Sequence, residues 1–264
     1  MKTLFNRLQL EILKSARIDC TPTWANAGVR VISDPFSRLY YVRSGRGEVR
    51  MGPRRLRLRP GRLYLIPAYT PASYRCPRTM DLTYLHIVAQ LSGLGPLSQF
   101  VSWPLDVEVR DLEEVEGRFD VVLDEGASFL ARDGALRLLL APFAEAPESR
   151  SVLGPDSARF VPVLQHIERN LHRRMTLAEL AALVHLQPNY FSALFAKRFG
   201  RSPTRYVQRR RVEVAAEQLV ASAVPLKQIA DDLGFSDEFH LSRAFKLVMG
   251  VAPSVYRENI MRDA

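Results

Sequence analysis

At 264 residues, 47% of them hydrophobic, the chain suits one large domain or two ordinary domains with packed cores. Its formal net charge of +9 at pH 7 fits an anionic partner such as DNA, although both halves of the sequence share the basic excess. We expect a cytoplasmic protein without a transmembrane helix, because no run of about 18 uncharged apolar residues exists. No signal peptide is expected, because Arg7, Glu11 and Lys14 interrupt the N-terminal segment. Cys20 and Cys76 form neither a CxxC pair nor a zinc motif, and are expected to be core residues.

Short β-strands are predicted between residues 38 and 90, after a first alternating apolar and polar segment at residues 8–12. In the segment RRLRLRPG, leucines and arginines alternate and therefore point to opposite faces, and Pro60–Gly61 marks a turn. The evenly spaced strands predict a barrel or jelly roll of the cupin type. The arginine row Arg55, Arg57 and Arg59 is either a nucleic-acid contact or, as we favour, a solvated strand face that discourages edge pairing.

Two amphipathic helices are predicted between Asp111 and Leu140, because apolar residues recur there at helical spacing. Their apolar stripes require a partner surface. Residues 144–157 combine Pro, Gly, Ser and charged residues without apolar periodicity. This segment is predicted to link two domains.

A helical pattern occurs twice in the C-terminal part of the sequence, with Ser192 and Phe195 standing 50 positions before Ser242 and Phe245. Each copy combines a short apolar helix, a turn and a second helix, which is the layout of a helix-turn-helix motif. The first copy opens with the capping box T-L-A-E at residues 176–179, and its second helix runs from a proline to a glycine. In the second copy, Gly234 permits the turn, and Ser236 or Asp237 supplies the N-cap of the following helix.

One continuous helix is predicted from Pro203 to Ala221, between the two copies. At 1.5 Å per residue it is about 28 Å long. Such a rod can hold two recognition helices in successive turns of the major groove, which lie ~34 Å apart. Four arginines decorate this helix and are either a solvated face or phosphate contacts: Arg205, Arg209, Arg210 and Arg211.

Residues 160–258 resemble the DNA-binding domain of the AraC/XylS family of transcriptional regulators. The resemblance is carried by GFSDEFHLSRAFK, by Gly250–Arg257 and by the shorter echo LAELAALVHLQPNYFSALFAKRFGRSP. Upstream, FSRLYYVRSGRGEV, LRPGRLYLIPAYTPASY and LTYLHIVA resemble the effector-sensing domain of the same family. The resemblance implies an α+β protein. A cupin-like β-barrel or jelly roll with helices would occupy residues 1–143, a linker 144–157, and an all-α domain 158–264, whose helix-turn-helix units at 176–199 and 225–249 are joined by a linker helix.

The resemblance also implies the function, that of a sequence-specific, DNA-binding transcriptional regulator and activator. Such a protein binds double-stranded DNA, contacts RNA polymerase and responds to a small-molecule effector, for which a sugar is one option. In an alternative, the regulator is independent of any effector and its β-domain serves only dimerisation or protein contact. Helices such as those at 111–140 often pair two subunits in this family, so a homodimer is implied, while packing on their own barrel remains the other option.

Base reading requires donors, acceptors or methyl contacts on the exposed side of each recognition helix. By resemblance, the base-reading positions are Asn189, Ser192 and Ala193 in the first helix and Glu238, Phe239, Ser242 and Arg243 in the second. Arg243 is the strongest candidate, because a guanidinium can bind guanine O6 and N7 together. Phosphate contacts are expected from Lys197, Lys246 and Arg257.

A ligand in the barrel would lie among aromatic and polar side chains, and the expected lining is Trp24, Arg38, Tyr41, Tyr74, Tyr84 and His86. Tyr74, Tyr84 and His86 match pocket positions of sugar-sensing relatives, whereas ordinary core aromatics are the alternative. Cupin-like barrels can also hold catalytic metals, but His86 is the only histidine before residue 160. We therefore predict no catalytic residue, no metal and no cofactor.

Overall fold

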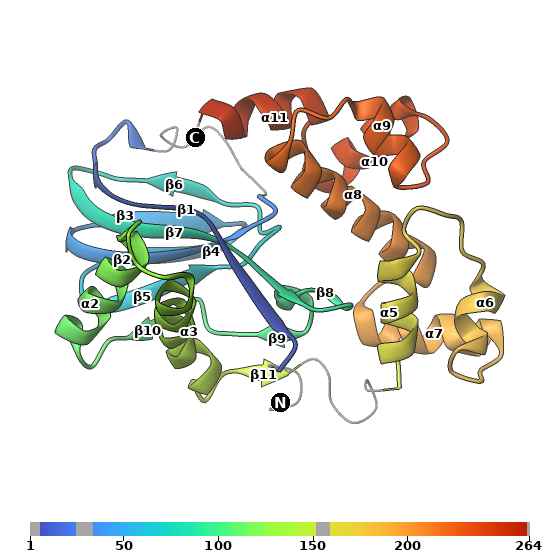
Figure 1. Ribbon diagram of the computed structural model, residues 1–264, viewed down its shortest axis with the longest axis horizontal. Coiled ribbons are helices and arrows are strands. Elements are labelled where there is room, and N and C mark those ends of the chain that lie inside the picture. The colour runs from blue at the N-terminus through green and yellow to red at the C-terminus, as the bar shows by residue number, and fades with distance from the viewer. Residues whose placement is uncertain (1–5, 25–33, 152–158, 263–264) are drawn as a thin grey trace. The chain divides into compact units, whose positions relative to one another are not determined.

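The computed structural model describes residues 6–24, 34–151 and 159–262 (Figure 1). Its contacts divide the chain into two compact units. The N-terminal unit comprises Met1–Leu91 and Pro96–Val152, and the C-terminal unit comprises Ser92–Gly95 and Leu153–Ala264. The first is rich in sheet and the second is helical, so the predicted α+β organisation is confirmed.

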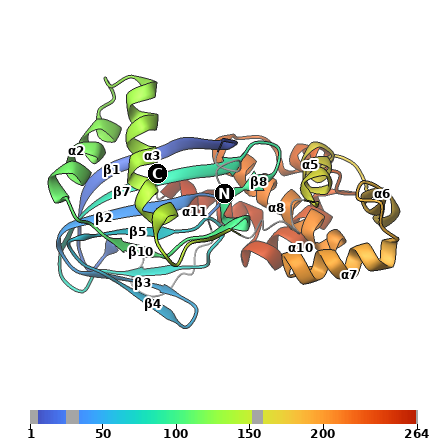
Figure 2. The same cartoon turned by 90° about the horizontal axis from the view of Figure 1, so that it is seen from below.

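A six-stranded sheet forms the larger layer of the N-terminal unit (Figure 2). Its order is β1 (Leu8–Cys20), β7 (Met80–Leu91), β2 (Ser37–Gly45), β5 (Arg62–Ile66) and β10 (Asp106–Glu108), while β8 (Gly95–Pro96) pairs with β7. A smaller sheet has the order β4 (Arg54–Leu58), β3 (Gly47–Met51) and β6 (Ser73–Arg75). Ile66 ends β5 and Ser73 begins β6, so residues 62–75 contribute one strand to each of the two sheets.

Apolar side chains fill both faces of the larger sheet, because successive residues of a strand point to opposite sides. On one face, Tyr40 and Tyr64 pack with Val49, Leu58 and Tyr74 of the smaller sheet. The opposite face is covered by α2 (Leu112–Leu123) and α3 (Phe129–Glu145), whose apolar residues pack against the larger sheet. Each of the two helices therefore buries one apolar stripe on the sheet of its own unit. This is the arrangement expected if the helices pack on their own barrel.

One short strand pairing extends the N-terminal unit into the segment expected as a linker. The 3₁₀ helix η2 (Leu97–Gln99) leads into β9 (Val101–Ser102), which pairs with β11 (Arg150–Ser151). Since α3 continues to Glu145, residues 144–151 belong to secondary structure or short turns of this unit rather than to an irregular linker. The rest of the expected linker, residues 152–157, lies outside the described residues.

The C-terminal unit consists of helices whose ends follow the predicted signals. They are α5 (Val161–Arg169), α6 (Leu177–Ala182), α7 (Pro188–Phe199), α8 (Pro203–Ala221), α9 (Leu226–Asp232), α10 (Glu238–Met249) and α11 (Pro253–Arg262). The capping box of Thr176 and Glu179 is present, and Gly200 ends α7 in the left-handed conformation. Asp237, not Ser236, is the N-cap of α10. None of the helices in the described ranges is long and apolar enough to cross a membrane.

Candidate nucleic-acid interface

The first helix-turn-helix is formed by α6 and α7. Hydrogen bonds from Arg173 and then His166 lower the pKa of Glu179 to about 2, so its carboxylate stays ionised at the start of α6. Phe191 and Phe195 are fully buried and hold α7 in an aromatic cluster with Phe160, which lies 5.8 Å from Phe195 between ring centroids. Burying one face of α7 leaves the other facing outward, as expected for an amphipathic helix.

The second helix-turn-helix is formed by α9 and α10. Gly234 has φ +65° in the turn, and Asp237 accepts a hydrogen bond of 2.6 Å from the His240 amide, which lowers the pKa of the Asp237 carboxyl. Leu241 and Phe245 are fully buried. α8 packs against both α7 and α10, so it joins the two motifs within the C-terminal unit (Figure 1).

All nine residues predicted for DNA contact lie on outward-facing positions of α7 and α10. Asn189, Ala193, Lys197, Phe239, Arg243 and Lys246 are exposed, and Ser192, Glu238 and Ser242 are half-buried. Phe239 is 69% exposed at the start of α10, although an aromatic side chain would normally be buried. Their contact with DNA stays a prediction, and none of them is needed for the core.

Tyr190 was not singled out by the sequence, yet 59% of its surface is exposed on the first turn of α7. It stands next to Asn189 and can offer a phenolic hydroxyl to a phosphate or a base. The helical periodicity of residues 188–199 could have identified Tyr190, because Phe191 and Phe195 define the buried side of α7.

Three of the four arginines on α8 have a structural role, which corrects both alternatives proposed for them. Arg210 is 2% exposed and binds Glu168 on α5 at 2.8 Å and Glu213 at 2.6 Å. Arg209 binds the other oxygen of Glu213, also at 2.8 Å. Only Arg205 of the four is exposed.

Arg211 connects the turn of the second motif with the segment after α5 through backbone oxygens. Its guanidinium donates to the carbonyl of Gly234 in the second motif at 2.9 Å and to that of Arg173 after α5 at 2.6 Å. Burial lowers the pKa of Arg211. Arg257 is likewise engaged with the Val224 carbonyl at 2.6 Å, so its guanidinium is partly committed to the fold rather than wholly available for phosphate.

Five of the six residues expected around an effector lie in or beside the cluster between the two sheets: Arg38, Tyr84 and His86 on the larger sheet, Tyr74 on the smaller sheet and Trp24 after the end of β1. Arg38 forms a buried ion pair with Asp34, and its guanidinium lies 5.1 Å from the Tyr74 ring. Trp24 contacts Tyr74 edge-on, and Tyr84 lies beside His86 with ring centroids 4.9 Å apart.

His86 is kept neutral in this cluster, because burial and then the positive charge of Arg38 lower its pKa to about 3. The Asp34–Arg38 pair is therefore the charged element there. Tyr41 does not belong with the other five. It lies on the opposite face of β2, stacks on Phe119 and donates a hydrogen bond to Glu116 at 3.0 Å. Its direction follows from the strand alternation that sends Tyr40 into the cluster.

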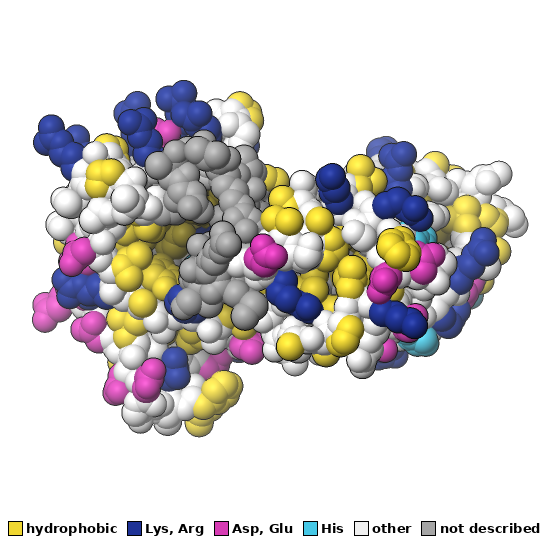
Figure 3. Space-filling view, turned by 90° about the horizontal axis from the view of Figure 1, so that it is seen from above, with side chains coloured by type: hydrophobic (Ala, Val, Ile, Leu, Met, Phe, Trp, Pro, Cys, Tyr) yellow, Lys and Arg dark blue, Asp and Glu magenta, His cyan; other side chains and the backbone are white. Residues whose placement is uncertain are grey.

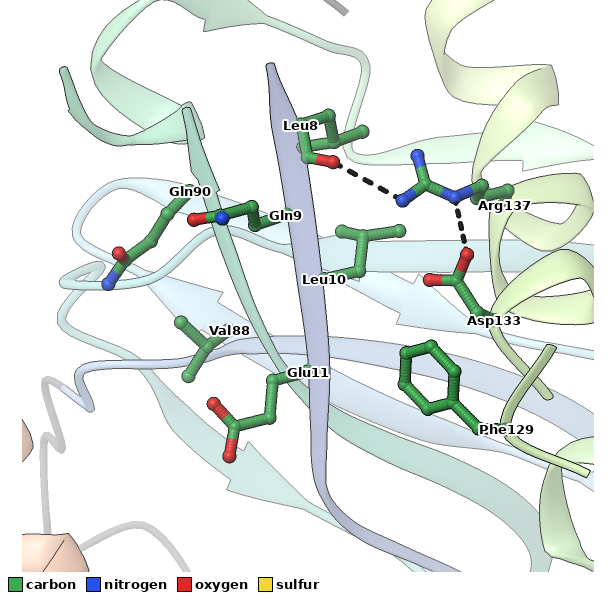
Figure 4. Close-up of a pocket in the computed structure, with 9 residues that line it drawn as sticks. All are labelled: Leu8, Gln9, Leu10, Glu11, Val88, Gln90, Phe129, Asp133 and Arg137. Carbon is green, nitrogen blue, oxygen red and sulfur yellow. Dashed lines mark hydrogen bonds and ion pairs between the residues drawn. The ribbon is translucent and has the colours of Figure 1, made fainter. Parts of the chain in front are cut away.

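A separate hollow of about 460 Å³ lies between α3 and the edge of the larger sheet (Figure 4). Leu8, Leu10, Val88 and Phe129 line it, and Arg137 donates to the Leu8 carbonyl at 3.2 Å and to Asp133 at 2.7 Å. None of the expected effector residues lines this hollow. Among the residues that the structure describes, no three His, Cys, Asp or Glu side chains are grouped for a metal ion.

Comparison with known proteins places the strongest similarity in the C-terminal unit. A family model described as "Helix-turn-helix domain" matches residues 180–259. An uncharacterized HTH-type transcriptional regulator of Bacillus subtilis, YfiF, is 31% identical over 116 residues, which are 44% of this chain and 37% of YfiF. A putative AraC-like transcription regulator of Streptomyces antibioticus is 29% identical over 63% of this chain and 54% of its own length. The chain thus matches about a third to a half of these two relatives.

Other similarities extend over both units. The raffinose operon transcriptional regulatory protein RafR of Pediococcus pentosaceus is 24% identical, with 98% of each chain covered. A crystal structure of ToxT from Vibrio cholerae superposes with a TM-score of 0.58 at 12% identity, covering 96% of this chain and 98% of ToxT. ToxT with a bound unsaturated fatty acid gives a TM-score of 0.53 at 13% identity, covering 95% and 94%. At these identities the structures show a shared fold.

Proposed function

We propose that the chain is a transcriptional regulator of the AraC type with a helix-turn-helix DNA-binding domain, and that α7 and α10 enter two successive major grooves and read base edges. The observation that supports this most is that each helix is held by a buried phenylalanine core while its opposite side presents the predicted contact residues. The length of α8 fits the span between two grooves. The proposal includes that the protein is a regulator rather than an enzyme, that it acts on DNA in the cytoplasm, and that it contacts RNA polymerase to activate transcription.

Arg243→Ala is expected to weaken binding to the preferred duplex by about 1–3 kcal/mol and to relax the preference for one G·C pair. The preferred duplex is first obtained by selection from a random DNA pool, and affinities are then measured by fluorescence anisotropy. In contrast, Lys246→Ala should weaken binding to all duplexes alike and reduce the salt slope by about 1, as expected for a phosphate contact.

The matched control for this experiment is Arg110→Ala, which removes an exposed arginine from the N-terminal unit. It should leave base preference unchanged. An Arg243→Ala protein that keeps both the affinity and the base preference of the parent would contradict the assignment of α10 as a reading helix.

The effector part of the proposal places a small molecule between the two sheets, beside Arg38, Tyr74 and His86. A buried ion pair surrounded by aromatic rings supports it, since ligand sites combine apolar walls with a few polar groups. RafR regulates a raffinose operon by name and a ToxT structure holds a fatty acid, so a sugar and a fatty acid are the two chemistries to compare.

A bound effector should raise the thermal midpoint, because at a hundredfold excess over Kd a native-state ligand adds ~2.7 kcal/mol. We expect a shift with one of the two chemistries that is lost in the variant Arg38→Met. If neither sugars nor fatty acids move the midpoint, the alternative of an effector-independent regulator, with a β-domain for dimerisation or protein contact, replaces this part of the proposal.

We further propose that α3 pairs two copies of the chain. Phe129, Leu130 and Leu138 are 75%, 79% and 50% exposed on it, outside the stripe that it buries on its own sheet. Sedimentation should give a dimer that Leu130→Glu converts to a monomer, and a monomeric parent protein at micromolar concentration would rule the pairing out.

A further inference from the structure

The segment from residue 35 to residue 80 has an extreme charge composition. It contains eleven arginines and a single acidic residue, Glu48. Three of the arginines bind acids outside this segment, since Arg38 pairs with Asp34, Arg43 with Glu116 and Arg62 with Asp106. The other eight are exposed: Arg46, Arg50, Arg54, Arg55, Arg57, Arg59, Arg75 and Arg78. The fold thus uses three of these charges and leaves eight at the surface.

The register of the smaller sheet brings four of the exposed arginines onto one face. Arg50 on β3 lies opposite Arg55 on β4, and Glu48 on β3 lies between Arg57 on β4 and Arg75 on β6. The alternate residues of the same strands, such as Val49, Leu58 and Tyr74, point into the core. We call this outward surface, made by Arg50, Arg55, Arg57 and Arg75, the arginine face. Figure 3 shows basic side chains projecting together from one edge of the N-terminal unit.

At Arg50 and Arg55 the arginine face is expected to cost folding free energy. Like charges directly opposite on neighbouring strands repel each other, as Arg50 and Arg55 do. Glu48 relieves only part of this repulsion, through an ion pair of 3.6 Å with Arg50. No other ion pair in the part of the chain that the structure describes involves the arginines of this face.

Protection of a sheet edge does not explain the arrangement. Charged residues on an edge strand discourage pairing with another chain, and this reason could account for Arg55 and Arg57 on β4. Arg50, however, lies on β3, which is the central strand of the sheet and has both neighbours in place. A role outside the fold is therefore needed for the face as a whole.

We propose that the arginine face is an auxiliary docking surface for the phosphate backbone of duplex DNA. Guanidinium groups match phosphates in both charge and geometry, and neutralising phosphates releases counterions. Arg55 and Arg57 are two residues apart on a strand, about 6.7 Å, which is close to twice the ~3.4 Å axial rise per phosphate of one DNA strand. Contacts to phosphates carry no sequence information directly, so the proposed contact is independent of sequence.

This inference rests on the proposed function in one respect, the choice of duplex DNA as the binding partner. It adds a contact from the N-terminal unit, which the recognition helices do not supply. An acidic protein is the competing occupant of such a surface, and it is distinguished by the experiment.

The test compares two variants of the full chain that each lose two exposed arginines, Arg55→Gln/Arg57→Gln on the arginine face and Arg7→Gln/Arg110→Gln elsewhere. Binding to a mixed-sequence duplex that lacks the selected site is measured by anisotropy between about 50 and 200 mM salt. The face variant should bind about 5–20-fold more weakly at low salt, with a salt slope smaller by about 2, at ~0.9 for each lost phosphate contact. The control should change far less.

Thermal unfolding tests whether the face variant binds more weakly only because it is less stable. This variant should melt at the same temperature as the parent or higher, because Arg55 no longer repels Arg50. Equal duplex affinities and slopes for the two variants would overturn the proposal. So would loss of binding to polyglutamate with unchanged binding to duplex, which would assign the face to an acidic protein. Whether the recognition helices read DNA is tested separately, by the affinity of Arg243→Ala for the selected duplex.

Discussion

Replacing Arg210 with methionine should lower the free energy of unfolding of the C-terminal unit by about 3–5 kcal/mol, because it leaves two carboxylates without their shared partner. The side chain of Glu213 is 1% exposed and that of Glu168 is 14% exposed, so neither can regain full hydration while the unit stays folded. Arg209 would still neutralise one oxygen of Glu213, which places the effect toward the lower end of the range.

Urea unfolding followed with two probes can assign this loss to one unit. Both tryptophans, Trp24 and Trp103, belong to the N-terminal unit, so their fluorescence reports on that unit, whereas far-UV circular dichroism is dominated by helices. The dichroism transition should move and the fluorescence transition should not. Arg205→Met, at an exposed position of the same helix, should cost less than about 0.5 kcal/mol.

A second variant, Arg210→Met/Glu213→Leu, distinguishes the cost of leaving a buried carboxylate without its charge partner from the cost of lost packing. Apolar side chains of similar volume often replace buried ion pairs without a net cost. The double variant should therefore recover part of the stability that Arg210→Met loses. If Arg210→Met unfolds at the same urea concentration as the parent, the cluster does not stabilise the unit.

Gly234→Ala should reduce both stability and DNA affinity much more than Gly250→Ala. Both glycines have positive φ, +65° and +81°, so both substitutions carry the cost of the left-handed conformation, about 1–2 kcal/mol. A Cβ at position 234 would lie 2.5 Å from the backbone oxygen of His172, while a Cβ at position 250 meets nothing within 4 Å. Only the first substitution must move the turn of the second motif.

Moving this turn would also break the hydrogen bond from Arg211 to the Gly234 carbonyl, and would shift α10 relative to α7. We expect Gly234→Ala to bind the selected duplex at least about tenfold more weakly at a temperature where both variants are folded, since 1.4 kcal/mol corresponds to a factor of ten. Equal affinities for the two alanine variants would show that the contact with His172 does not position the second motif.

The helices of the C-terminal unit could be predicted because their ends depend on nearby residues. Pro203 and Ala221 bound α8 as expected, and Thr176 forms its capping box with Glu179 three residues away. The roles of Arg210 and Arg211 could not be predicted in the same way. Their partners Glu168, Gly234 and Arg173 are distant in sequence, and only tertiary packing brings them together.

In the N-terminal unit, the limit of prediction was the direction of side chains. Tyr40 and Tyr41 are both aromatic and adjacent, and a shift of one residue in register exchanges the faces that they occupy. The sequence thus supported an aromatic pocket but placed Tyr41 in it, where the structure has Tyr40. The residues predicted for DNA contact lie on the outward side of α7 and α10, because a helix with one apolar stripe has only one side left, and their contact with DNA stays a prediction.

The two hydrogen bonds of Arg211 end on main-chain oxygens, which every amino acid possesses. The link from α8 to the turn of the second motif and to the segment after α5 is therefore insulated from most side-chain changes in that segment. Under the proposed function, substitutions on the outward sides of α7 and α10 would alter the preferred operator while the placement of the second motif on α8 is kept. Such a regulator would acquire new target genes by point substitution.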